Sequence, residues 1–141
     1  MKKPASKVLV LDSWAMLAYL NAEPAAQEVR QALRNARRNE VRVLFSLINY
    51  GECLYIIERE QGFQQAQKAA GLIDQLPVLI AAADRSIVFD AAHLKARYPI
   101  AYADAFAAAL AKQQRARLMT GDPEFRAVEP EVAIHSLPDE R

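Results

Sequence analysis

Four acidic residues, spread over nearly the whole chain, are embedded in apolar segments where core residues would be expected. They are Asp12 in KVLVLD, Glu52 in INYGECLYII, Asp104 in YADAFAAALA and Asp122 in RLMTGD. Burying a carboxylate is costly, so such a group normally has a partner, carries a proton or binds a metal. If the four side chains meet, they repel one another, and a divalent cation is the simplest remedy. The pattern therefore predicts a metal-dependent phosphodiesterase.

Three of the four acids also have a structural explanation. Asp12 could cap a helix, Asp104 could stabilise a first helical turn, and Asp122 begins the favourable cap sequence Asp-Pro-Glu. Glu52 does not fit this explanation, because it lies inside a helical segment, among apolar residues and beyond capping range. Asn49 lies one turn earlier on the same face and forms a polar stripe with it. For Asp12, Asp104 and Asp122, each taken alone, the functional and the structural explanation stay open.

Apolar segments of two lengths alternate along the chain, which predicts strands alternating with helices. The predicted strands are Lys7–Asp12, Val41–Phe45, Val78–Ala82, Arg117–Thr120 and Val132–His135. The predicted helices are Trp14–Leu20, Pro24–Asn39, 46–61, Phe63–Leu76, 84–98 and Tyr102–Gln114, with Ser46 and Asp84 as caps and Gly62 as a stop. Right-handed crossovers then give an α/β fold with a central parallel sheet of about five strands flanked by helices. No linker divides the chain, so residues 1–141 are expected to form a single domain.

The four acids map to one rim of the predicted sheet. In a parallel α/β sheet every strand delivers its carboxyl end to the same rim, and ligands bind there. Asp12 ends the first predicted strand, and Asp122 follows the fourth. Glu52 lies in the second turn of the helix after the second strand, and Asp104 opens an alanine-rich helix. We therefore expect all four carboxylates to converge.

The composition narrows the class of protein and its compartment. A formal net charge of +1 excludes strong steering of the whole molecule toward nucleic acid, although local basic patches could still act. The single cysteine cannot form an internal disulfide, which fits a cytoplasmic protein. Asp12 interrupts the apolar run near the N-terminus, which argues against a signal peptide, and no other stretch is apolar enough for a membrane span. The chain has no glycine-rich phosphate loop, so nucleoside triphosphates are not the expected substrates.

The ordered motifs resemble those of the PIN domain and, within it, most closely the VapC-type toxins of toxin–antitoxin pairs. They are Asp12-Ser13 after the first strand, Asn49 and Glu52 on a helix, Asp104 before AFAAALA, and Thr120-Gly121-Asp122 with Phe125. The similarity covers nearly the whole chain, and the motifs keep their order. It implies an endoribonuclease that uses Mg²⁺ or Mn²⁺ to hydrolyse phosphodiester bonds in RNA. It also implies a cognate antitoxin protein as partner and a homodimer.

The resemblance also implies a role for each acid. Asp12 and Asp104 would be the primary metal ligands. Asp122 and Glu52 would complete the catalytic pocket, directly or through water. All acids of the family pattern are present, so the resemblance implies an active enzyme.

Five further residues have expected supporting roles. By resemblance, Ser13 and Thr120 would hydrogen-bond carboxylates or the phosphate, and Asn49 would orient the glutamate one turn later. Arg85 and Arg126 lie close to the predicted rim and are candidates for contacts with RNA phosphates. These assignments depend on the acids converging as expected.

Other polar residues have plainer explanations. Arg30, Arg34 and Arg38 share one helix face, which is either a solvated face or a surface for RNA or a partner. Cys53 is next to Glu52 but has no activating partner beside it, so a packing role is expected. None of these residues is needed for the predicted metal chemistry.

Three alternative functions stay open from the sequence. A haloacid-dehalogenase-like phosphatase would use an aspartyl nucleophile after the first strand and usually has a second acid two residues later, whereas Asp12 is followed by Ser13 and Trp14. A phosphoacceptor signalling domain would need an acid pair there and an acid ending the third strand, and neither pattern is clear. A non-catalytic nucleic-acid or protein-binding module could use the metal structurally. Incubation with RNA and Mg²⁺, with and without EDTA, separates this module from the nuclease.

Overall fold

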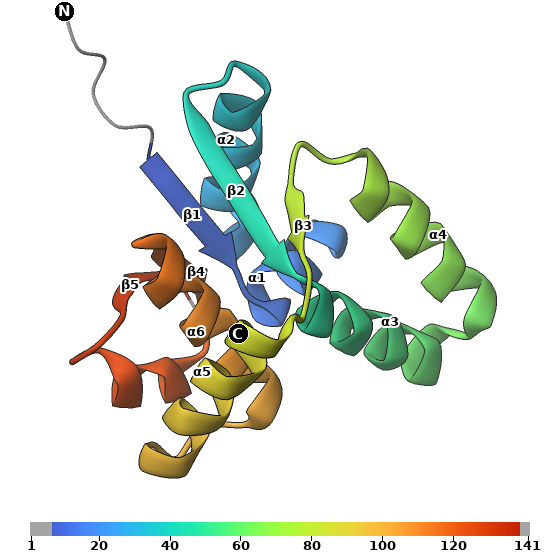
Figure 1. Cartoon of the computed structure of the whole chain (residues 1–141). Coiled ribbons are helices and arrows are strands. Elements are labelled where there is room, and N and C mark those ends of the chain that lie inside the picture. The colour runs from blue at the N-terminus through green and yellow to red at the C-terminus, as the bar shows by residue number, and fades with distance from the viewer. Residues whose placement is uncertain (1–6, 139–141) are drawn as a thin grey trace, which may run out of the picture.

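The computed structural model describes residues 7–138 as one parallel sheet with helices on both faces (Figure 1). The strands are β1 (Lys7–Leu11), β2 (Val41–Ser46), β3 (Leu79–Ala81), β4 (Arg117–Thr120) and β5 (Ala133–Ser136), in the order β3-β2-β1-β4-β5. The helices are α1 (Ser13–Leu20), α2 (Gln27–Arg37), α3 (Leu47–Gln61), α4 (Phe63–Gln75), α5 (Arg85–Arg97) and α6 (Tyr102–Gln114), with short 3₁₀ helices η1 (Pro24–Ala26) and η2 (Pro123–Val128). The predicted α/β fold with a five-stranded parallel sheet is confirmed.

The strand register places alternate side chains on opposite faces of the sheet. Val10 is aligned with Leu44 and Leu118, and these three residues pack in one core cluster with α5 and α6. Leu11 and its partner Phe45 belong to a second cluster, under α1 and α2. Both faces of the central strands are therefore buried, which explains why their sequences are apolar without alternation.

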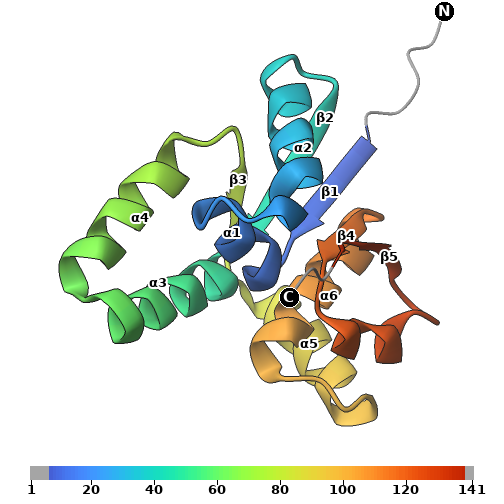
Figure 2. The ribbon, with the colours of Figure 1, turned by 180° about the vertical axis from the view of Figure 1, so that it is seen from behind.

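Helices α3 and α4 pack against each other and extend to one side of the sheet (Figure 2). Part of their contact is a small separate cluster of Ile57, Ala66 and Ala69, backed by Leu17 and Leu20 of α1. The Tyr50 hydroxyl of α3 also bonds to the Ala70 carbonyl and the Asp74 carboxylate of α4. With 15 residues α3 is the longest helix, and no helix within residues 7–138 is long and apolar enough to cross a membrane. The α3–α4 pair therefore leaves most of its surface to solvent.

The residues expected to cap and stop helices do so. The Ser46 hydroxyl accepts a hydrogen bond from the Ile48 amide at the start of α3. Gly62 ends that helix with φ of 96°, in the region that favours glycine. The Asp84 carboxylate accepts from the Ile87 amide and starts α5. Local signals therefore fix where α3 begins, directly after β2, and where α5 begins, a short loop after β3.

The helix predicted for Pro24–Asn39 is wrong in part. The segment starts as the 3₁₀ helix η1 and continues as α2, which ends at Arg37. Asn39 adopts a left-handed conformation with φ of 59°, and the amides of Arg38 and Glu40 both bond to the Asn35 carbonyl. This arrangement closes a helix end, so α2 stops before Asn39.

Candidate active site

The pairing of β1 with β4 brings two acids to the same rim of the sheet. Leu11 is aligned with Met119, so Asp12 and Asp122 leave adjacent strands on the same side. The Asp12 amide donates to the Met119 carbonyl at 3.4 Å and extends this contact beyond the strand. Asp12 then caps α1, and Asp122 caps η2. The capping and the convergent positions expected from the sequence are both present.

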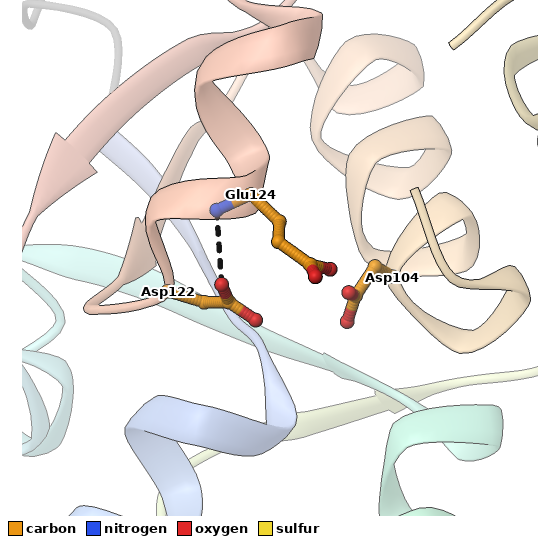
Figure 3. A group of neighbouring side chains, drawn as sticks. All are labelled: Asp104, Asp122 and Glu124. Carbon is orange, nitrogen blue, oxygen red and sulfur yellow. Dashed lines mark hydrogen bonds between the residues drawn. The ribbon is translucent and has the colours of Figure 1, made fainter. Parts of the chain in front are cut away.

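Asp104 and Asp122 lie close to a third acid, Glu124, which the sequence patterns did not predict as a site residue. One carboxylate oxygen from each of Asp104, Asp122 and Glu124 lies within 4.8 Å of the other two (Figure 3). Asp104 comes from the first turn of α6. Asp122 Oδ1 accepts a hydrogen bond from the Glu124 amide at 2.9 Å, in the tight turn that opens η2. The Asp-Pro-Glu sequence was the available signal for Glu124, but it predicted only a cap.

Thr120 joins Asp12 to the segment that carries Asp122. The Thr120 hydroxyl donates to Asp12 Oδ2 at 2.5 Å and accepts from the Asp122 amide at 2.9 Å. The other oxygen of Asp12, Oδ1, accepts from the Ala15 amide at 2.8 Å. Asp12 and Thr120 are each only 1% exposed. The orientation of the Asp12 carboxylate is therefore fixed by buried donors on both sides.

Burial makes Asp12 a weak acid in the absence of a cation. Desolvation raises the pKa of Asp12 from 3.8 to about 7, and the hydrogen bonds from Thr120 and Ala15 oppose part of this rise. Repulsion from Asp104 and Asp122 raises the pKa further. Asp12 therefore belongs to the same electrostatic site as the three clustered acids, although it lies outside their group.

The pKa of Asp104 is raised for the same reasons, and Glu52 also contributes to the rise. Burial raises the pKa of Asp104 to about 7, followed in size by repulsion from Asp122, Glu52 and Glu124. Glu52 is half-buried on α3 and, like Asp12, is not a member of the three-acid group. The sequence predicted four converging acids. The structure shows five acids that repel one another, and one carboxylate oxygen from each of Asp104, Asp122 and Glu124 lies within 4.8 Å of the other two.

The donor atoms of this site fit a hard divalent cation. Carboxylate oxygens are the preferred ligands of Mg²⁺ and Mn²⁺. Across residues 7–138, none of the acids named above forms an ion pair with a basic side chain. A further oxygen, Asn49 Oδ1, is buried without a hydrogen-bond donor among the described residues. The site therefore has negative charge and oxygen donors that the described part of the chain does not itself neutralise.

The sequence profile of the PIN domain matches residues 9–130. The chain belongs to the PIN domain family. The matched span contains all five acids of the site. No curated protein matches the chain in sequence.

Solved structures share the fold of this PIN domain at low sequence identity. VapBC2 from Rickettsia felis, bound to a DNA fragment from its promoter, aligns with a TM-score of 0.75 and 16% identity over 93% of this chain and 99% of that chain. VapBC-1 from nontypeable Haemophilus influenzae aligns with a TM-score of 0.68 and 23% identity over 92% of this chain and 97% of that chain. VapC20 from Mycobacterium tuberculosis, a Sarcin-Ricin loop cleaving toxin, aligns with a TM-score of 0.68 and 18% identity over 85% of this chain and 94% of that chain. The resemblance to VapC-type proteins is therefore confirmed at the level of the fold.

Two hydrogen-bonding residues of the PIN domain have partners other than those expected. Asn49 Nδ2 donates to the Ala103 carbonyl at 3.1 Å, directly before Asp104, instead of orienting Glu52. Ser13 Oγ donates to the Asn49 carbonyl at 3.3 Å, and its predicted contact with a carboxylate or the substrate phosphate stays a prediction. The reason is topological, because α1, α3 and the start of α6 meet at this rim and leave backbone carbonyls to be satisfied. Asn49 therefore holds the first turn of the helix that carries Asp104.

A glycine allows an aromatic ring to pack directly against the Thr120–Asp122 turn. A Cβ atom at Gly121 would lie 2.3 Å from the Trp14 ring, so any larger residue would push the ring or the turn away. Phe125 is fully buried in the core next to the same turn. The two aromatics therefore support the backbone on which Asp122 stands.

The basic residues of the PIN domain lie outside the three-acid group. Arg126 is exposed on η2, two residues after Glu124. Arg85 is the first residue of α5, and its guanidinium lies 4.5 Å from the centre of the Phe89 ring. Arg126 is the nearer of the two in the sequence to the three-acid group, because it lies on η2 together with Glu124.

Two other polar features have local explanations in the structure. Arg30 and Arg34 donate to Gln27 and Gln31 of their own helix, as expected of a solvated face. Cys53 is buried, and burial raises the pKa of its thiol to about 12, which suppresses the thiolate. Neither feature contributes a reactive group to the site.

The phosphatase alternative does not fit the position of Asp12. Both of its carboxylate oxygens accept hydrogen bonds, from Ala15 and Thr120, and the residue is almost completely buried. An aspartyl nucleophile must reach its substrate. Membership of the PIN family also sets aside the phosphatase and the signalling domain.

Proposed function

We propose that this PIN domain is a metal-dependent endoribonuclease that hydrolyses phosphodiester bonds in RNA and acts as the toxin of a type II toxin–antitoxin pair. The observation that supports this most is the contact of three carboxylates, Asp104, Asp122 and Glu124, within 4.8 Å. Family membership supports the same class of activity. So does the shared fold with VapC proteins, one of which is described as a Sarcin-Ricin loop cleaving toxin. The chain would act as a single domain.

Mg²⁺ or Mn²⁺ is the proposed cofactor. Asp104 and Asp122 would hold it with Glu124, and Asp12 and Glu52 would complete the site directly or through water. Such an ion lowers the pKa of a bound water and neutralises charge on a phosphate under attack. The proposal keeps the four residues predicted from the sequence, Asp12, Glu52, Asp104 and Asp122, and adds Glu124. It differs from the prediction in one role: Asp122 replaces Asp12 as a primary ligand, because Asp12 lies outside the three-acid group.

The neighbouring residues would keep these acids in place. The hydrogen bond from Thr120 fixes the direction of the Asp12 carboxylate. The hydrogen bond from Asn49 to the Ala103 carbonyl holds the first turn of α6, and Ser13 ties α1 to the same point of α3. Three segments that are distant in the sequence are thereby linked around the acids, so little reorganisation would be needed when a substrate phosphate arrives.

RNA would reach this rim through local positive charge, because the net charge of the whole chain is only +1. Arg126 and Arg85 are the proposed phosphate contacts. Arg126 is exposed on the same short helix as Glu124, and Arg85 is exposed at the start of α5. Contacts of this kind position the RNA without selecting its sequence.

A cognate antitoxin and a second copy of the chain are the proposed protein partners, in the cytoplasm. Large apolar side chains at the surface support this, because such patches mark interaction sites. They are Leu47 and Tyr55 on α3, Phe63 and Leu72 on α4, Leu79 and Ile80 on β3, Phe89 on α5 and Tyr102 on α6. A disordered antitoxin segment could fold along the helices and place a basic side chain among the acids, where it would displace the metal.

The first test is cleavage of RNA by the purified chain with Mg²⁺ or Mn²⁺, with and without EDTA. We expect cleavage that requires the metal and that disappears in Asp12→Ala. Intact RNA under all conditions would leave the non-catalytic binding module as the better explanation.

The second test addresses the toxin role in cells. We expect growth arrest when the chain is expressed alone, rescue by a small antitoxin encoded beside it, and no arrest with Asp12→Ala. A chain that is harmless at high expression, while the purified protein cleaves RNA, would refute the toxin role and leave the nuclease activity standing.

A further inference from the structure

A pocket lies beside the acidic group, at the carboxyl ends of β4 and β5, with η2 as one wall. Its volume is about 340 Å³, at the lower end of the range for small-molecule sites. Asp122 belongs both to the lining of this pocket and to the three-acid group. A phosphate held at the acids would therefore stand next to whatever the pocket contains.

The lining of the pocket combines apolar surface with hydrogen-bond donors. Pro123, which is exposed, and Ile134, which is half-buried, provide the apolar surface, and Ser136 provides a hydroxyl. Leu137 also lines the pocket, but it is only 4% exposed and belongs to the core. The β5 residues of the lining, Ile134 and Ser136, do not belong to the acidic group. The proposed metal chemistry therefore gives these two residues no role. A base with an apolar face and polar edges suits such a lining.

Arg126 gives the pocket a positive charge that the described part of the protein does not use. It lines the pocket and is exposed, and it forms no ion pair with any residue in 7–138. Arg97, in contrast, is paired with Glu131. An unpaired guanidinium beside a cluster of acids is suited to an anionic ligand that also approaches those acids, such as a nucleotide.

We propose that the pocket binds one unpaired ribonucleotide next to the cleaved bond, with its base against Ile134 and Pro123 and its second phosphate at Arg126. The inference deepens the proposed ribonuclease function and rests on it for the nature of the substrate. A base inside a duplex could not enter, so the pocket selects single-stranded or looped RNA. It would also give the enzyme a base preference at one position beside the cut.

Ser136→Tyr is the variant that fills the pocket. Ser136 is the last residue of β5 and is exposed, so a larger side chain can be accommodated without disturbing the core. Ala133→Tyr is the matched control, because Ala133 is exposed at the other end of the same strand. Arg126→Ala removes the charge alone, and Arg117→Ala is its control at the amino end of β4.

The first measurement is direct binding in EDTA, which does not depend on catalysis. The four ribonucleoside 5′-monophosphates and inorganic phosphate are titrated into the full chain and followed by the amide signals of Ile134 and Ser136. We expect at least one nucleotide to shift these signals and phosphate alone not to do so. Ser136→Tyr and Arg126→Ala should each weaken binding about tenfold or more, on the scale of one lost stacking or charged contact.

The second measurement is cleavage of a randomised single-stranded RNA pool with Mg²⁺. The wild type and Ala133→Tyr should share a base preference at one position beside the cut, and Ser136→Tyr should lose it while still cleaving. Cleavage with an unchanged preference and unchanged KM in Ser136→Tyr would overturn the pocket and leave the nuclease standing.

Two further outcomes distinguish a failure of the nucleotide pocket from a failure of the proposed nuclease activity, and distinguish a nucleotide from an antitoxin peptide as the ligand of the pocket. Pocket-dependent nucleotide binding without any cleavage would refute the nuclease and support a nucleotide site of the binding module. If Ser136→Tyr and Arg126→Ala weaken binding of the antitoxin but not of nucleotides, the pocket is a docking site for a peptide, and the ribonucleotide assignment is wrong.

Discussion

The two ends of helix α6 hold carboxylates in opposite ways. At its C-terminal end, Glu131 accepts hydrogen bonds from Arg97, Lys112 and Tyr98. These donors, with Arg97 the largest cause, hold the pKa of Glu131 far below its ordinary value of 4.5. At the N-terminal end, burial and neighbouring acids raise the pKa of Asp104 from 3.8 to about 7. Helix α6 therefore carries Asp104, which lacks a counter-charge, at one end, and at the other end its Lys112 helps to neutralise Glu131.

The difference separates a carboxylate that holds the fold from carboxylates available to a ligand. We call Glu131, Arg97, Tyr98 and Lys112 the Glu131 cluster. It ties the ends of α5 and α6 to the segment between η2 and β5, so its charges are used within the protein. The acids at the other end have no such partner among residues 7–138, which is the arrangement expected of a cation site.

The largest expected effect comes from removing charge at the uncompensated end. Asp104→Asn keeps an oxygen and tolerates a helix start, but it removes a charge that the cation needs. We expect a loss of at least ~100-fold in the rate of RNA cleavage at limiting Mn²⁺, on the scale of other charge-stabilising groups. Cleavage at the wild-type rate would show that Asp104 is not a ligand.

The same variant should not lower stability without metal. The Asp104 charge repels the other four acids of the site in the absence of a cation, so its loss relieves repulsion. In EDTA the thermal midpoint of Asp104→Asn should therefore equal or exceed that of the wild type. A lower midpoint would place Asp104 among the structural carboxylates, as Glu131 is.

The second prediction separates capping from metal binding at Asp122. Its Oδ1 caps η2 by accepting from the Glu124 amide, and serine caps a helix about as well. Asp122→Ser should therefore keep the thermal midpoint while it sharply reduces Mn²⁺ affinity, measured by calorimetry, and the cleavage rate. If metal affinity and cleavage are both retained, Asp122 is only a cap, and Asp104 and Glu124 stay as the close pair.

Local patterns in the sequence predicted those parts of the fold and site that depend on short segments. The parallel sheet followed from strands alternating with helices, and the cap at Ser46 and the stop at Gly62 are properties of single residues. Asp12 and Asp122 could be placed at one rim because each follows a strand. These predictions needed only the order of elements and the direction of the chain.

Contacts between distant segments could not be predicted in this way. Asn49 was expected to act on Glu52 in its own helix, but its partner is the Ala103 carbonyl, 54 residues away. Glu124 was taken as part of a cap, because its distance to Asp104 depends on how η2 packs beside α6. Glu131 gave no signal at all, since its donors come from two other helices. Side-chain partners across the fold are fixed by packing, which a single sequence does not show.

The third prediction concerns the pH dependence of stability without metal. Asp12 and Asp104 have pKa values of about 7 in the folded chain, against 3.8 for an ordinary aspartate. Between about pH 4 and pH 7 the folded chain therefore holds protons that the unfolded chain has released, and stability falls as the pH rises through this window. The free energy of unfolding in EDTA, measured by urea titration, should follow this slope.

Glu131 should make the protein less stable as the pH falls, which is opposite to the effect of Asp12 and Asp104. Bound metal should cancel the loss of stability that Asp12 and Asp104 cause as the pH rises. Because its pKa is lowered, its contribution to stability is present above 4.5 and is lost only as the pH falls below that value. Mg²⁺ binds the ionised acids, so it should stabilise the protein most near and above pH 7. A flat stability profile in EDTA from pH 4 to 7 would contradict the raised pKa values of Asp12 and Asp104.

The smallest expected effect on catalysis comes from the other end of α6. Glu131→Gln keeps the shape of the side chain but replaces three charge-assisted or short-range contacts by weaker ones, so the thermal midpoint should fall in both EDTA and Mg²⁺. The cleavage rate at saturating Mg²⁺ should stay near that of the wild type at temperatures where the variant is folded. Glu129→Gln is the matched control, since Glu129 is exposed nearby and forms no ion pair within residues 7–138. A large loss of cleavage in folded Glu131→Gln would show that the cluster also sets the position of Asp104, and that the two ends of α6 are not independent.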